Sequence, residues 1–170
     1  MKKISSFHVG VAAEAFAAAN FARCEYDVLV QYGANQPEYD IVVSNQNKTL
    51  KISVKGSQDG GWGLTQKYKK GNTYHQAIDA WLNAHHKGTI FCLVQFQNTK
   101  IDEMPRIYLA HPEEIAKQLK QSANGRGETI LYENHTWGPT ADAYGTIDKI
   151  PDEWKFTTER VDEMISLYGL

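Results

Sequence analysis

The sequence predicts one α/β domain in which a mixed central sheet is flanked by helices. Two observations predict this class: apolar residues recur at helical spacing in some segments and at strand spacing in others, and the segments follow in the order helix, three strands, helix, strand. The chain has 170 residues, which is enough for one domain with a substantial core. We expect residues 1–110 to form this core and residues 111–170 to add a helical and irregular C-terminal extension.

The composition excludes several classes of protein. A hydrophobic content of 42% is ordinary for a soluble globular protein. The net charge of −2 excludes a strongly basic protein that coats nucleic acid, although a local basic patch is compatible with it. Cys24 and Cys92 show no zinc-binding spacing and are expected to be buried thiols in a reducing compartment. No signal peptide or membrane-spanning stretch is recognisable, so we expect a cytoplasmic protein that does not contact a membrane.

The first predicted element is a helix that is rich in alanine. It begins after an N-cap at Ser5 or Ser6 and runs to about Arg23. Glu14 is its only acidic residue, either as an exposed glutamate or at the margin of the packed face, where it could reach the edge of a sheet. Small and apolar residues that share one face should let the helix lie close to the sheet: Val9, Ala12, Ala13, Phe16 and Ala17.

Three strands are predicted next, as an antiparallel meander. Residues 25–32 form the first strand, and residues 33–36 a turn. Residues 39–44 and 50–54 then form a hairpin around the polar turn 45–48. A hairpin this short brings the start of one strand beside the end of the other, so Asp40 and Lys55 should meet at one edge of the sheet. An exposed salt bridge, worth at most about 1 kcal/mol, would be the simplest explanation of such a pair.

The glycine-rich segment 58–73 is predicted to be a loop. Lys67, Lys69 and Lys70 are interleaved there with aromatic residues, among them Trp62. Such a mixture suits a surface that grips a nucleic-acid strand, with phosphate contacts beside stacking platforms. A loop that only contacts solvent is the alternative.

The remaining elements are scaffold. Residues 89–96 are almost continuously apolar, which predicts a central strand covered on both faces. The other expected elements are an amphipathic helix over 73–86, a strand over 104–110, a helix from His111 through Leu119, a loop over 122–128, a short strand over 129–132, an irregular segment over 135–144 and a last helix over 158–168.

Three motifs in order resemble the PD-(D/E)XK nuclease superfamily. They are Gly10-x-x-Ala13-Glu14 on the first helix, Pro37-x-x-Asp40, and Ser53-x-Lys55-x-Ser57. The sequence looks most like the branch that holds archaeal Holliday-junction resolvases and related small bacterial endonucleases. The resemblance covers roughly the first third of the chain, and it implies a restriction-endonuclease-like core with the order αβββαβ.

The resemblance also implies a site and a function. A metal-dependent DNA endonuclease would use Glu14, Asp40, Ser53 and Lys55 in catalysis. Mg²⁺ or Mn²⁺ would be held by Asp40, by the main-chain carbonyl of Val54 and by Glu14, directly or through water. Lys55 would orient the attacking water or stabilise developing negative charge. The substrate would be DNA, with branched DNA among the options, and the domain could act as a homodimer. The residues expected to contact nucleic acid are Lys67, Lys69, Lys70, Trp62 and Ser57.

The sequence departs from the family pattern at Ser53, where the family usually has Glu, Asp or Gln. A serine hydroxyl is a weak and neutral metal ligand. In one interpretation a residue on a helix supplies the missing acid, and the candidates are Asp79 and Glu14. Asp79 is the weaker candidate, because it lies opposite the apolar stripe of its helix. A second reading is a non-catalytic module that binds nucleic acid or a protein partner and keeps Asp40 and Lys55 as an ion pair. A third is an unrelated α/β protein. A serine hydrolase and a phosphate-binding P-loop are not supported, because neither motif occurs.

Overall fold

The computed structural model describes residues 2–31 and 38–170. Tyr32, the predicted turn 33–36 and Pro37 lie outside the described residues. The helices are α1 (Ser6–Arg23), α2 (Tyr74–Ala84), α3 (Pro112–Gln121) and α4 (Thr158–Tyr168), with 3-10 turns η1 (Gln66–Tyr68) and η2 (Asp152–Trp154). The strands are β1 (Asp27–Val30), β2 (Ile41–Ser44), β3 (Thr49–Ser57), β4 (Gly61–Gly63), β5 (Thr89–Gln95), β6 (Arg106–Ala110), β7 (Ile130–Tyr132), β8 (Asn134–Thr136) and β9 (Ile147–Lys149).

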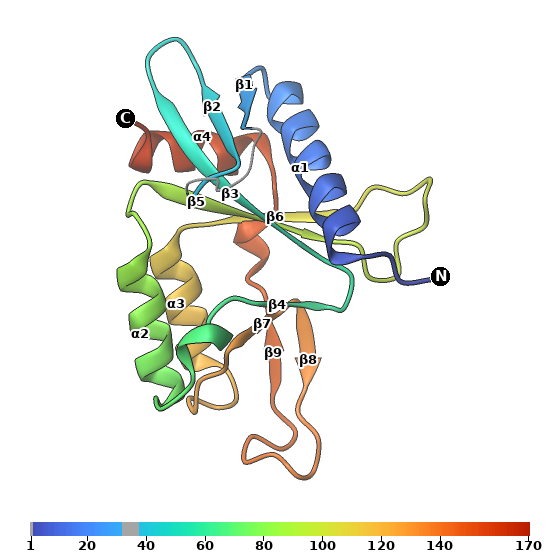
Figure 1. Cartoon of the computed structure of the whole chain (residues 1–170), viewed down its shortest axis with the longest axis vertical. Coiled ribbons are helices and arrows are strands. Elements are labelled where there is room, and N and C mark those ends of the chain that lie inside the picture. Colours follow the sequence, from blue (N-terminus) through green and yellow to red (C-terminus); the bar gives the residue numbers. More distant parts are fainter. Residues whose placement is uncertain (1, 32–37) are drawn as a thin grey trace.

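The central sheet has five strands in the order β1-β2-β3-β5-β6. β1, β2 and β3 form an antiparallel meander, β3 pairs with β5 in parallel, and β5 pairs with β6 in an antiparallel manner (Figure 1). The parallel connection from β3 to β5 passes through α2, which gives the usual helix crossover between parallel strands. The predicted mixed sheet flanked by helices is therefore confirmed.

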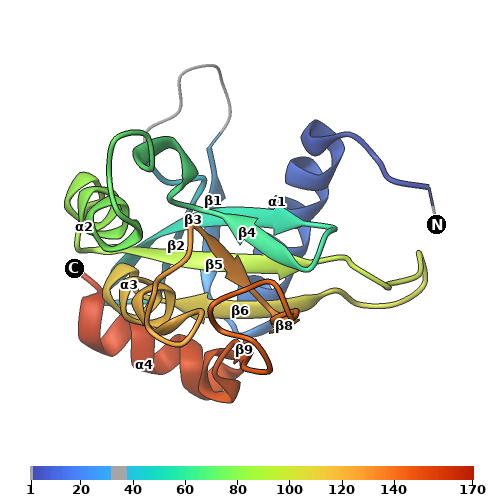
Figure 2. The same cartoon turned by 90° about the horizontal axis from the view of Figure 1, so that it is seen from below.

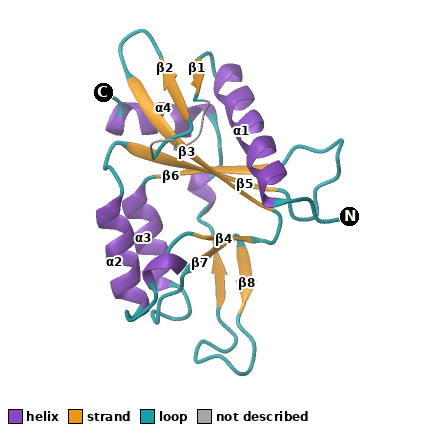
Figure 3. Cartoon of the chain, viewed as in Figure 1, coloured by secondary structure: helices purple, strands orange, loops and turns teal. Residues whose placement is uncertain are grey.

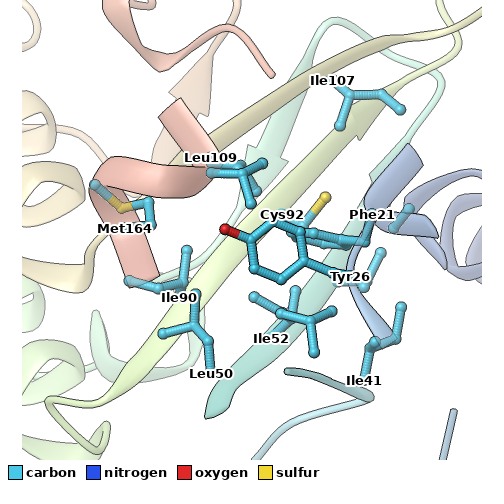
Figure 4. Packing of buried hydrophobic residues seen from close by; sticks show 14 of the residues in the cluster. Phe21, Tyr26, Ile41, Leu50, Ile52, Ile90, Cys92, Ile107, Leu109 and Met164 are labelled. Carbon is cyan, nitrogen blue, oxygen red and sulfur yellow. The ribbon is translucent and has the colours of Figure 1, made fainter. Parts of the chain in front are cut away.

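Helices cover both faces of this sheet and enclose two apolar cores. α1 and α4 pack on one face, where Phe21 and Met164 meet Leu50, Ile52 and the other strand residues that Figure 4 labels. α2 and α3 pack on the other face, around Trp81. Elements after residue 110 contribute to both cores. All of β5 is buried, as expected for the central strand. Within the described residues, none of the helices is both long and apolar enough to cross a bilayer.

The two cysteines differ in their surroundings. Cys92 is fully buried in β5, and this burial raises the pKa of its thiol. Cys24, at the end of α1, is only partly buried, and its Sγ lies 3.6 Å from the Thr158 hydroxyl. The predicted burial of the thiols is therefore correct for Cys92 alone, because the helix that carries Cys24 ends at the rim of the core.

Two short β pairings were not predicted. The segment expected to be a loop contains β4, which pairs with β7, followed by η1, which packs against the start of α2 (Figure 2). The segment expected to be irregular contributes β8, which pairs with β9 (Figure 3). Each of these strands has three residues, which is too short to show an alternating pattern.

Candidate functional site

The candidate site lies where β2 stops and β3 continues. Ile41, the first residue of β2, pairs with Ile52, so the part of β3 from Ser53 to Ser57 has no strand partner on that side among the described residues. We call this part the open edge of β3. On its other side it pairs with β5 along its whole length. Side chains alternate along a strand, so Val54 turns toward the core under α1, while Ser53 and Lys55 turn to the opposite face.

Asp40 fills the place of a further strand residue at this edge. Its backbone N–H donates to the carbonyl of Ile52 at 2.8 Å, and its Oδ2 accepts from the N–H of Val54 at 2.7 Å. The N–H and C=O of one strand residue point to the same side, so the Val54 carbonyl also faces the open edge. A carboxylate and a main-chain carbonyl therefore lie together there.

Glu14 reaches this region because α1 lies very close to β3. Gly56 makes this approach possible: a Cβ on Gly56 would be 2.9 Å from the Ala13 Cβ and 3.0 Å from the carbonyl oxygen of Val9. Burial raises the pKa of Glu14 above its ordinary value, the negative charge of Asp40 raises it further, and the positive charge of Lys55 opposes this rise.

These opposing effects on one carboxyl group mean that all three charged groups share one region. Asp40, just before β2, and Lys55, on the open edge, thus lie near enough to Glu14 on α1 for their charges to affect its pKa. No salt bridge joins Asp40 to Lys55 in the part of the chain that the structure describes, and the Asp40 carboxylate accepts instead from the N–H of Val54.

Lys55 lines a pocket at the end of β3. The pocket has a volume of about 330 Å³ and lies between the start of α1, the open edge and β4, with Ser6, Val9 and Trp62 among its lining residues. The indole Nε1 of Trp62 donates to the carbonyl of Lys55 at 2.9 Å, which holds the backbone of β3 at this point. A ligand in the pocket would therefore lie beside Lys55.

The two serines of the third motif have different surroundings. Ser53 is 1% exposed and lies on the same face of β3 as Lys55. Ser57 is buried, its hydroxyl donates to the carbonyl of Gly61 at 2.6 Å, and the N–H of Asp59 donates to the same hydroxyl at 3.2 Å. The hydroxyl of Ser57 thus fixes the turn after β3, and the predicted contact of Ser57 with nucleic acid stays a prediction.

Trp62 does not provide the predicted stacking platform. It is only 3% exposed, and its ring packs edge-on against Tyr108 within the core under α2 and α3. Of the three predicted lysines, Lys67 and Lys70 are exposed on the segment that includes η1. Lys69 is partly buried, since its Nζ donates to the carbonyl of Asn72 at 3.0 Å and lies 4.6 Å from the centre of the Tyr74 ring.

Sequence reasoning missed the role of Gly56. A glycine inside a strand often marks a close approach of another backbone, and this signal was present in the sequence. Asp79, the alternative source of an acid, forms a salt bridge with Lys120 at 2.5 Å on the surface of α2 and α3. It is therefore committed to another contact, and Glu14 is the remaining candidate.

The residues at the open edge form a small set of oxygen ligands. Asp40 and Glu14 offer carboxylates, and Val54 offers a carbonyl. Among the described residues, no group of three or more His, Cys, Asp or Glu side chains could hold a metal ion. Two carboxylates and one carbonyl suit Mg²⁺ better than zinc. Mg²⁺ prefers oxygen ligands and usually keeps several waters, whereas zinc prefers a closed set of nitrogen and sulfur ligands.

Comparison with known proteins adds no family to this description. No family model matches the chain, and a search of the curated proteins gives no significant match.

Proposed function

We propose that this chain is a metal-dependent endonuclease that hydrolyses phosphodiester bonds in DNA. The observation that carries the proposal is the meeting of Glu14, Asp40, the Val54 carbonyl and Lys55 at the open edge of β3. These are the residues that the resemblance to PD-(D/E)XK nucleases assigns to the site. The strand order, with an antiparallel meander joined by a parallel pairing to β5, supports a restriction-endonuclease-like core.

Each residue has a separate role in the proposed reaction. Asp40, Glu14 and the Val54 carbonyl would hold Mg²⁺ or Mn²⁺, which when bound would activate a water and offset negative charge on the phosphate. Lys55 would place its ammonium beside the attacked phosphate and orient the water. The hydrogen bond from the N–H of Val54 keeps the Asp40 carboxylate at the edge. Trp62 holds the main chain of Lys55 from the opposite side.

Exposed lysines on the segment after β4 would hold the substrate. Lys67 and Lys70 are exposed on the segment between β4 and α2, and we assign them contacts with phosphate groups, which fix position and carry no sequence information. Trp62 is excluded from this role by its burial. The resemblance also suggests branched or otherwise structured DNA as one class of substrate.

A second candidate function is a module of the same fold that binds nucleic acid or a protein partner without cutting. Ser53 favours it, because a buried neutral hydroxyl stands where the family usually has a charged or amide ligand. A site with two carboxylates gives a metal ion less negative charge than a site with three. The two functions predict opposite results in a cleavage assay.

The test is cleavage of linear, nicked, single-stranded and four-way-junction DNA with Mg²⁺ and with Mn²⁺. Lys55→Met should reduce the cleavage rate by about a hundredfold or more, the usual effect of removing one group that stabilises transition-state charge. Lys51→Met is the matched control, because Lys51 lies four residues earlier on the same face of β3 and its ammonium lies 5.0 Å from the centre of the Tyr39 ring. The control should cut at the wild-type rate.

Other outcomes would change the proposal in defined ways. If the wild-type protein cuts none of the substrates but binds DNA, the second candidate function is correct. If Lys55→Met cuts as fast as Lys51→Met, the assigned role of Lys55 is wrong. Thermal denaturation with and without Mg²⁺ adds a measurement that does not depend on cleavage: the ion should stabilise the wild type and not Asp40→Asn.

A further inference from the structure

At one end of the molecule, positive side chains lie over aromatic rings. The Nζ of Lys69 lies 4.6 Å from the centre of the Tyr74 ring, and the Cζ of Arg126 lies 4.8 Å from the same centre. Arg126 also lies 5.1 Å from the centre of the Trp137 ring, so its guanidinium bridges the two rings. These residues come from the segment between η1 and α2, the loop after α3 and the end of β8, which Figure 1 shows together at its lower end.

Two further rings continue this series to the wall of the pocket that Lys55 lines. The His135 ring lies edge-on to Trp137, with 4.6 Å between the ring centres, and stacks on the Tyr132 ring at 4.2 Å. Tyr132 adjoins Gly61, because a Cβ on Gly61 would be 3.2 Å from Cδ1 of Tyr132, and Gly61 lines the pocket. We call the following side chains the aromatic row: Tyr74, Arg126, Trp137, His135 and Tyr132.

The aromatic row keeps part of its surface in solvent. All five of its side chains are partly exposed. Trp137 differs in this respect from the other tryptophans of the chain, since Trp62, Trp81 and Trp154 are at most 3% exposed. Large rings that only fill a core are normally covered, so the row offers ring surface that a ligand can contact.

The surface beside the row is positively charged. Residues 64–76 contain three lysines and no acidic residue. The two acids that touch the row already have partners: Glu128 accepts from Arg126 at 2.9 Å, and Asp148 accepts from Nε1 of Trp137 at 2.8 Å. These contacts use the carboxylates within the protein, which leaves the lysines to attract a negatively charged ligand.

We propose that the aromatic row binds the unpaired bases of single-stranded DNA, while Lys67 and Lys70 contact its phosphate groups. Proteins that bind single strands combine a basic track for the backbone with aromatic side chains and arginine on which the bases stack. A duplex hides the faces of its bases, so only an unpaired strand can use the rings in this way. Because every base has such a face, we expect binding with little sequence preference.

The position of the row also gives the proposed nuclease a class of substrate, and this part rests on the proposed function. Tyr132 is at the end of the row that adjoins the pocket, through Gly61. An unpaired strand that lies on the row would therefore lead to Lys55. The preferred substrate is then DNA with a single-stranded segment beside the cut, so a duplex with a single-stranded tail should be cut faster than a blunt duplex.

Binding of a thymidine oligomer without divalent metal tests the row independently of cleavage. Trp137 is the partly exposed tryptophan, so the oligomer should quench the tryptophan fluorescence of the wild type. An oligomer of the same length that has the sugar-phosphate backbone but no bases should bind at least about tenfold more weakly, because it cannot stack.

Substitutions then assign the binding to the row. Trp137→Ala should raise the dissociation constant for a labelled thymidine oligomer, followed by fluorescence anisotropy, by about ten- to a hundredfold. His135→Ala is a second variant, which leaves the hydrogen bond from Trp137 to Asp148 in place. Phe7→Ala is the matched control, since Phe7 is an aromatic residue that is 71% exposed on α1. It should bind like the wild type, and circular dichroism checks that each variant is folded.

The results separate this inference from the proposed function. A base-free oligomer that binds as tightly as the thymidine oligomer overturns the inference, and so do folded Trp137→Ala and His135→Ala variants that both bind like Phe7→Ala. Binding as expected, without cleavage in Mg²⁺ or Mn²⁺, overturns only the nuclease. Equal cleavage of tailed and blunt duplexes overturns the proposed class of substrate and leaves the nuclease in place.

Discussion

α1 lies very close to β3 at Gly56, and a methyl group added there should move the helix. In Gly56→Ala the new Cβ would lie 2.9 Å from the Cβ of Ala13 and 2.9 Å from Cγ1 of Val9. It would also lie 3.0 Å from the main-chain carbonyl oxygen of Val9. Rotation of a side chain can relieve the contact with Cγ1, but it cannot move a backbone oxygen or an alanine Cβ. The helix itself has to shift.

The size of the effect follows from these distances. Carbon atoms in ordinary contact are about 3.5–4.0 Å apart, so α1 has to retreat by roughly 0.5–1 Å. Overpacking of this kind costs about 1–3 kcal/mol, and the lower entropy of the unfolded alanine chain returns about 0.4–1 kcal/mol. We expect a net loss of about 1–2 kcal/mol in the free energy of unfolding. Because Glu14 moves with the helix, the cleavage rate should fall by roughly ten- to a hundredfold.

The assay is urea denaturation followed by circular dichroism, with Gly10→Ala as the matched control. Gly10 is on the same helix, yet a Cβ there would have nothing within 4 Å. Alanine in place of glycine inside a helix should therefore raise the free energy of unfolding by about 0.5–1 kcal/mol. The two glycine-to-alanine changes thus have opposite predicted signs. If Gly56→Ala is as stable as the wild type or is stabilised like Gly10→Ala, the close approach of α1 is not what positions Glu14.

Three further predictions concern Asp40 and Glu14 at the site and Tyr26, which lies away from it beside α4. Asp40→Ala should lower the free energy of unfolding by about 1–2 kcal/mol in urea denaturation, because the partly buried N–H of Val54 loses its acceptor, whereas Asp40→Asn keeps an acceptor and should lose less. The raised pKa of Glu14 means that its contribution to stability is fully present in acid and is lost as the pH rises through its folded-state pKa. Glu14→Gln should therefore be more stable than the wild type at neutral pH, and this advantage should disappear in acid. Burial, followed by the hydrogen bond to Asp162, raises the pKa of Tyr26 from 10.0 to about 12. The wild type should therefore lose stability as the pH rises between these values, and Tyr26→Phe should lose less, because Cys92 and Tyr108, whose pKa values are also raised, still titrate in the variant. Thermal denaturation at alkaline pH can establish the difference.

Much of the fold could be predicted from the sequence, because its main elements are long and regular. Ser5 caps α1 as expected, and Arg23 ends it. The meander was predicted from three short strands, two of them around a polar turn. β3, however, is longer than predicted and runs to Ser57, because its second half is stabilised by β5. Pairing between strands so far apart in the chain leaves no periodic signal in either of them.

The candidate site was predicted in part for a related reason. Asp40 and Lys55 are brought together by a local hairpin, and a hairpin can be read from the sequence. Trp62 was misjudged because its burial depends on β7, whose residues follow about 70 positions later. A tryptophan among glycines and lysines resembles an exposed aromatic until the distant partner strand is known. Tertiary pairing decided its environment, and local composition did not.

The open edge of β3 also bears on how the protein avoids aggregation. A strand edge with unpaired N–H and C=O groups is a template for another strand, and natural sheets protect such edges with charge or with a covering element. Here the carboxylate of Asp40 accepts a hydrogen bond from the N–H of Val54 on this edge, and α1 passes over the strand at Gly56. The same carboxylate that is proposed to bind a metal ion therefore shields the sheet from foreign strands. A variant that loses Asp40 would lose this protection together with the proposed metal ligand, so solubility alone is a reason to keep the residue.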